Sequence, residues 1–291
     1  MSMEKLKSAL AAGGEHLGDL CWWTLTDATV DRNTLEENWL DSGLPAEFLP
    51  EPPTAERALK TATREALIGQ SERLIRLGLE SEAEIIYAVV REHRHPDGSV
   101  SFTQEARITL DRLTKSFSSD APSHDLVLAT KAAFERLLYT HTTDEVRRAV
   151  VRALHAFAAI TLRDHGGVYW IPRTFSAQVR QLQTAVEKLG SSRFYLVPVH
   201  DSGDTNRSLG EAAQGALEEE LAGLEKEIES FLSAPPERAS TLVRRFDAFE
   251  ELRARAQLYR DILKVRVDDL DGRLDELGAA VEKLLVAKTA A

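Results

Sequence analysis

The last third of the chain, from about Asn206 to Lys288, has the pattern of two amphipathic helices joined by a proline turn. In the first helix, apolar residues recur at alternating steps of four and three, which is the spacing of a coiled-coil seam. The run Ser233-Ala-Pro-Pro-Glu237 ends this helix because proline cannot donate to the helical ladder and disfavours helix in the residue before it. The seam consists of Leu217, Leu221, Leu224, Ile228 and Phe231.

The second helix is predicted to run from about Glu237 to Lys288, with a length of roughly 75 Å. Gly272 and Gly278 weaken it and are candidate positions for a bend or break. The first helix can cover only its front part, and a helix this long is stable in water only if its apolar face is buried. The remaining stripe must therefore pack on the same chain, on a second copy or on another protein. The stripe consists of Val267, Leu270, Leu274, Leu277, Val281 and Leu284.

Composition excludes several classes of protein. The formal net charge of −11 argues against broad, non-specific nucleic-acid binding, which requires a basic surface. Cys21 is the single cysteine, so an internal disulfide and a cysteine zinc cluster are excluded, and its tryptophan neighbours favour a buried position over a nucleophilic role. No apolar run has membrane-spanning length, and the N-terminus lacks a secretory apolar core. We expect a cytoplasmic protein without a cofactor or metal.

Residues 1–205 are predicted to form an α+β head. Glu84 to His93 is rich in β-branched residues and is followed by the turn Pro96-Asp-Gly98, which predicts a β-hairpin over about 84–110. Residues 54–77 are predicted to be helical, and 143–199 has the order helix, strand, helix, strand. The expected fold is α+β and mostly helical, with this N-terminal head followed by an antiparallel helical hairpin or coiled coil over 206–291.

Two short motifs could support chemistry. The loop from His200 to Thr205 follows a strand and precedes a helix, a position where small polar loops bind phosphate or metal. It lacks the P-loop pattern, and its residues also suit helix capping, which we favour. His93 and His95 share one face of a strand, but two ligands do not make a zinc site.

A third set suggests contacts with nucleic acid. Arginines cluster on one helical face, and a short strand follows, as in a winged helix-turn-helix. Tyr169 and Trp170 on that strand could stack on bases or could belong to the core, which is the commoner role. The arginines are Arg147, Arg148 and Arg152.

The order of three segments resembles an uncharacterised family of prokaryotic and phage-type proteins. The segments are the proline-rich connector Gly43 to Pro53, the string Leu162-Arg-Asp-His-Gly-Gly-Val-Tyr-Trp-Ile-Pro172, and the strand Phe194 to Val199 that runs into a long acidic helix. The resemblance covers about residues 20 to 232. It implies no activity and no catalytic residue.

Our leading hypothesis is a non-enzymatic interaction or scaffold protein that assembles through its C-terminal helices, either as a homo-oligomer or with a protein partner. The first alternative is a nucleic-acid-associated factor that uses the arginines and aromatic residues above. The second alternative is an enzyme that uses the loop 200–205.

Overall fold

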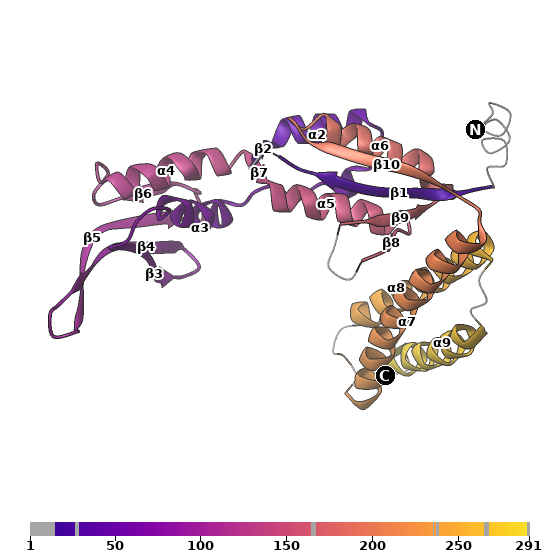
Figure 1. Ribbon diagram of the computed structural model, residues 1–291. Helices are drawn as coiled ribbons and strands as arrows, with labels where there is room; N and C mark the ends of the chain where they lie inside the picture. The colour runs from indigo at the N-terminus through magenta and orange to yellow at the C-terminus, as the bar shows by residue number, and fades with distance from the viewer. Residues whose placement is uncertain are drawn as a thin grey trace, which may run out of the picture. The chain divides into compact units, whose positions relative to one another are not determined.

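The structure is a computed structural model that describes residues 15–26, 29–163, 167–234, 236, 239–264 and 268–289 (Figure 1). Within the last helix, side chains are described from residue 272 to 284. The fold is α+β and mostly helical, as predicted. None of the helices in the described ranges is long and apolar enough to cross a membrane.

The chain forms two compact units. The first unit combines Met1–Leu25 with Val150–Ala291, and the second is Thr26–Ala149. The division therefore differs from the boundary predicted at residue 205. The physical reason is that the C-terminal helices share one apolar core with the sheet of the first unit, in which the Tyr259 hydroxyl donates to the Ala158 carbonyl at 3.0 Å.

The sheet of the first unit is antiparallel, with the strand order β10-β1-β9-β8. Helix α6 packs against β10 and β9. The preceding helix α5 ends at Ala156, and Ala158 just beyond it adopts a left-handed φ of 52°. The elements are β1 His16–Thr24, α5 Thr143–Ala156, β8 Ile160–Thr161, β9 Tyr169–Pro172, the 3-10 helix η2 Arg173–Phe175, α6 Ser176–Glu187 and β10 Arg193–His200.

Three helices follow this sheet: α7 Gly203–Ser233, α8 Ala239–Leu263 and α9 Asp268–Thr289. The helix predicted over 237–288 is thus divided in two. The break lies at Lys264, which has a left-handed φ of 54°, and precedes both glycines. Helix α9 folds back along α8, so that a Cβ on Gly278 would meet the Phe249 ring at 3.0 Å.

The described part of the predicted apolar stripe is buried within the chain. Its described members Leu274, Leu277, Val281 and Leu284 belong to one core cluster with residues of α7 and α8. Val267 and the side chain of Leu270 lie outside the described residues. The described part of the stripe is therefore not a free surface, because the chain turns at Lys264 and α9 packs on α7 and α8.

The second unit contains a second antiparallel sheet, with the order β3-β4-β5-β6. A β-hairpin is present where the sequence predicts one, but the helix predicted over 54–77 ends at Ala66. Residues 73–80 pair with β4 instead, so long-range pairing overrides the local helical pattern. The elements are β2 Thr29–Asp31, α2 Arg32–Asp41, the 3-10 helix η1 Ala46–Phe48, α3 Ala55–Ala66, β3 Arg73–Glu80, β4 Glu84–Arg94, β5 Val100–Asp111, β6 Phe117–Ser119, α4 Asp125–Leu137 and β7 Thr140–Thr142.

Replacing Leu277 with alanine should destabilise the protein by about 2 to 4 kcal/mol, because it removes a buried side chain and leaves a cavity. Chemical denaturation measures the change. Leu232→Ala is the matched control, since Leu232 is 54% exposed and its replacement should change the free energy of unfolding by less than about 0.5 kcal/mol. If Leu277→Ala keeps the stability of the wild type and only loses self-association, the intramolecular role of Leu277 is contradicted.

Candidate functional site

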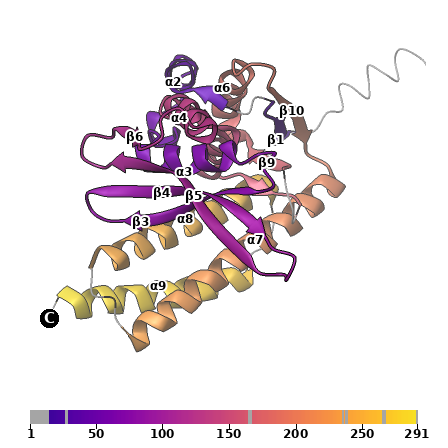
Figure 2. The ribbon, with the colours of Figure 1, turned by 90° about the vertical axis from the view of Figure 1, so that its left-hand side faces the viewer.

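The sheet β3-β4-β5-β6 has two different faces. Helices α3 and α4 lie on one side of it (Figure 2), and we call this side the inner face. Its core residues are Ile85, Val89, Ala106, Ile108 and Leu110, all buried together with residues of the two helices. We call the opposite side the outer face.

A β-bulge in β5 aims a carboxylate at the inner face. Val89 is paired with Ala106, and the next residue Val90 is paired with Gln104, so Glu105 is the extra residue. A bulge re-aims a side chain relative to the regular alternation of a strand. As a result, Glu105 lies on the same side as the buried Ala106 and reaches residues of α4.

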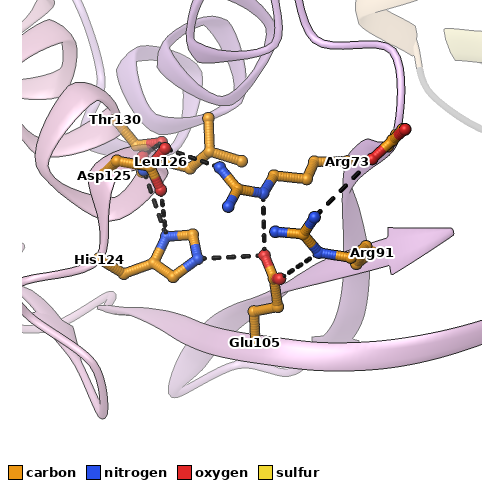
Figure 3. Close-up of polar contacts among 8 residues, drawn as sticks. Arg73, Arg91, Glu105, His124, Asp125, Leu126 and Thr130 are labelled. Carbon is orange, nitrogen blue, oxygen red and sulfur yellow. Dashed lines mark hydrogen bonds and ion pairs between the residues drawn. The ribbon is translucent and has the colours of Figure 1, made fainter.

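Glu105 is the centre of a polar cluster (Figure 3). Its carboxylate accepts hydrogen bonds from Arg91 Nε at 2.6 Å and His124 Nε2 at 3.2 Å, and it forms an ion pair with Arg73 Nε at 3.1 Å. The hydrogen bond from Arg91 holds the pKa of the Glu105 carboxyl below its usual value, and His124 and Arg73 act in the same direction. The negative charge of Glu105 is therefore balanced by neighbouring side chains.

His124 connects this cluster to the start of α4. Its Nδ1 lies 3.2 Å from the backbone N–H of Leu126 and 3.2 Å from the Asp125 carboxylate, and its Nε2 faces Glu105. Arg73 also donates to Asp125 at 2.7 Å. Because the donors and acceptors satisfy one another, we interpret the cluster as a clamp that holds β3, β4, β5 and α4 together, not as a reactive centre.

The outer face carries exposed apolar and cationic side chains. Leu79, Val100 and Phe102 are 47%, 48% and 50% exposed. The Arg76 guanidinium lies over the Phe102 ring, 5.1 Å from its centroid. Arg76 and Arg107 are both exposed. By strand alternation, the outer face consists of Leu74, Arg76, Leu79, Ile86, Ala88, Val90, Glu92, Arg94, Val100, Phe102, Gln104, Arg107 and Thr109.

The charges of the outer face are unevenly distributed. Arg76 and Arg107 are both opposite Ala88, one on each neighbouring strand. Neither has an acidic partner within ion-pair distance among the residues that the structure describes. Farther toward the hairpin turn, Glu92 pairs with Arg94 at 2.7 Å. The middle of this face is therefore basic.

The structure does not bring the predicted nucleic-acid contacts together on one surface. Arg147 is exposed but paired with Asp144 at 2.5 Å, whereas Arg148 and Arg152 are exposed on α5. Trp170 is fully buried and cannot stack on a base, because its side chain packs in the apolar core of the first unit. Tyr169 is half-buried and stacks on Trp23, with ring centroids 5.4 Å apart.

The loop 200–205 caps α7. Ser202 accepts a hydrogen bond from the backbone N–H of Thr205 at 3.2 Å, and Asp201 accepts one from Asn206 at 2.7 Å. Within the described ranges, no group of three or more His, Cys, Asp or Glu side chains is placed to hold a metal ion. Cys21 is buried, and burial raises the pKa of its thiol to about 12, which disfavours the reactive thiolate.

An open cavity of about 820 Å³ lies in the first unit, beside α7 and α8. Its main charged groups are already paired, since Arg255 donates to Glu220 at 2.5 Å. Burial and the nearby Arg255 lower the pKa of His155 on the cavity wall. The Arg255–Glu220 ion pair occupies part of the cavity wall, and we favour the outer face of the second unit as the candidate site.

The sequence contains a signal for this surface in strand β4. The run Ile85-Ile-Tyr-Ala-Val-Val90 is apolar without alternation, which is typical of a strand with apolar neighbours on both faces. An alternating pattern of apolar and polar residues would instead have predicted that one face of the strand is exposed to solvent. The pairing of Arg76 with Phe102 was not predictable, because it joins β3 to β5 across the intervening strand.

Glu145 is a buried carboxylate at the start of α5. It accepts a hydrogen bond from the backbone N–H of Thr142 at 2.7 Å and pairs with Arg57 at 2.6 Å and His141 at 3.4 Å. Thr142 Oγ1 accepts in turn from the Glu145 N–H, which completes a capping box. Burial raises the pKa of Glu145, but these contacts outweigh it and lower the pKa from 4.5 to about 2.

Glu145 should make the free energy of unfolding depend on pH. Because its pKa is lower in the folded state, its contribution is fully present above about pH 4.5 and is lost as the pH falls toward 2, for a total of roughly 3 kcal/mol. Unfolding free energies between pH 2 and 6 should therefore differ between the wild type and Glu145→Gln at pH 6 and converge at pH 2. Asp144→Asn, at an exposed neighbour, is the control. A difference that does not vary with pH would refute this role.

The chain belongs to a family of unknown function, DUF6744, whose family model matches residues 16–290. No curated protein and no solved structure matches the chain.

Proposed function

We propose that this member of the DUF6744 family is a non-enzymatic interaction protein, and that the outer face of β3-β4-β5-β6 is its binding surface. The observation that carries the proposal is that β4, an inner strand of this sheet, has apolar residues on its outer side. Ile86, Ala88 and Val90 of β4 lie on the outer face and are only partly buried, and contact with another molecule would remove their remaining apolar surface from water. Their neighbours Leu79, Val100 and Phe102 are about half exposed.

The polar clamp on the inner face supports this role. Binding surfaces are precise when rigid elements hold them. The contacts of Glu105 with Arg73 and Arg91 join β3, β4 and β5, the three strands whose other side carries the proposed surface. The clamp thus fixes the spacing between strands while leaving the outer face accessible.

This proposal keeps the functional class expected from the sequence and moves the contact surface from the C-terminal stripe to the sheet. The three C-terminal helices then serve as the core of the first unit. Cytoplasmic location and a prokaryotic or phage-type origin remain part of the proposal. We do not propose an enzyme that uses the loop 200–205, because its polar groups are engaged in capping α7.

A photo-crosslinking residue at position 102 should capture a partner in the native host, because this position is 50% exposed on the proposed surface. The same residue at position 113 is the matched control. Leu113 is 90% exposed and lies in the turn between β5 and β6, away from the outer face. Gel shifts of the purified protein after irradiation measure the adducts.

A discrete adduct at position 102 that is absent at position 113 would support the proposed function. Equal labelling of the two positions would mean that exposure alone determines capture. No adduct at position 102 would overturn the assignment of the outer face as a binding surface.

A further inference from the structure

We propose that the outer face of β3-β4-β5-β6 binds single-stranded nucleic acid, with Phe102 and Arg76 contacting a base and Arg107 contacting a phosphate. This inference rests on the proposed function, because it names the ligand class for the same surface. The juxtaposition that carries it is an aromatic ring under a guanidinium, next to a second exposed arginine on an open sheet face.

The first step is the flat contact surface. Bases stack on aromatic side chains and on the planes of arginine guanidinium groups. Phe102 is 50% exposed, and the Arg76 guanidinium lies 5.1 Å from its ring centroid. The pair therefore offers both kinds of stacking partner at one place, and the cation–π contact restrains the arginine.

The second step is the unbalanced positive charge. Arg73, Arg91 and Arg112 of the same sheet each have carboxylate partners. The guanidinium groups of Arg76 and Arg107, on the two strands that flank Ala88, form no ion pair among the described residues, although the Arg107 backbone N–H donates to Asp120 Oδ1 at 2.6 Å. Their Cα atoms are separated by two strand spacings, about 10 Å. A phosphate backbone that crosses Ala88 would supply the missing negative charge to both.

The third step is the extent of the surface. From Ile86 to Arg94, the nine residues of β4 extend over about 27 Å, which accommodates a short single strand. Beyond Ile86, the acidic residues Glu84 and Asp111 are register partners at the far end of the sheet, where they would repel phosphates. A short basic tract is consistent with the net charge of −11, which disfavours non-specific duplex binding.

An acidic protein helix fits the same surface less well. A helix that lies on a sheet buries the middle of the sheet face, and here that would remove Arg76 and Arg107 from water. Burying charged groups is costly unless every charge is paired. The phosphates of a single strand stay solvated while they contact Arg76 and Arg107. They therefore neutralise the two arginines without removing them fully from water.

The test is fluorescence anisotropy with the full chain and labelled 20-mers of deoxythymidine and uridine at 50 mM salt. We expect binding that weakens as salt is raised. Arg107→Ala should reduce the slope of log K against log salt by about one. Phe102→Ala should weaken binding about five-fold or more, because one stacked base is lost, whereas Phe102→Tyr keeps the ring and should bind like the wild type.

Two controls make the result specific. Arg148→Ala removes an exposed arginine on α5 and should leave both affinity and salt slope unchanged. An abasic 20-mer supplies the phosphates without bases and should bind about five-fold more weakly than the deoxythymidine 20-mer. Thermal melting of each variant verifies that it is folded.

Several outcomes would overturn the inference. No binding of either 20-mer at 50 mM salt would exclude this ligand class. Binding that Arg107→Ala and Phe102→Ala leave unchanged, or that Arg148→Ala abolishes, would place the contact elsewhere. If the 20-mers fail but position 102 forms a protein adduct in cells, the ligand class is wrong and the proposed binding surface stands. If both fail, the surface itself is wrong.

Discussion

The burial of apolar sheet faces under helices is the constraint on which both units depend. In the first unit, α7, α8 and α9 share a core with Trp170 and Ile160 of the sheet. In the second unit, α3 and α4 cover the inner face of β3-β4-β5-β6. A sheet or helix with one apolar side is stable only when that side is packed against another layer. The apolar faces of the C-terminal helices are therefore buried within the first unit, and only their remaining surface is available for assembly.

The same constraint makes the outer face exceptional. Its apolar residues on β4 have no covering layer within the second unit, and exposed arginines lie on both sides of them. The bulge at Glu105 gives the two faces different charges, because it directs the carboxylate to the inner face. There Arg73, Arg91 and His124 neutralise it. The outer face consequently keeps its positive charge, although the whole chain is acidic.

For both candidate surfaces considered from the sequence, the local pattern identifies residues but not what covers them. Amphipathic spacing correctly identified apolar residues such as Leu274 and Leu277 that are buried. It could not identify what buries them, since a helix stripe looks alike whether it meets the same chain or another one. Trp170 illustrates the same ambiguity, because an aromatic residue on a short strand reads equally as a base-stacking group or as core until its neighbours are known.

The sequence by itself determined the α+β class, the helical C-terminal third and the turn at Asp97-Gly98, because these depend on composition, periodicity and turn chemistry within a few residues. Only the tertiary structure decided that residues 73–80 form a strand, that Lys264 ends a helix, and that Arg76 reaches Phe102. Strand pairing and the contact between β3 and β5 depend on residues distant in the chain, and their energies can override local propensity. Lys264 adopts a backbone conformation that its residue type does not favour, and the packing of α9 against α8 requires the chain to turn there.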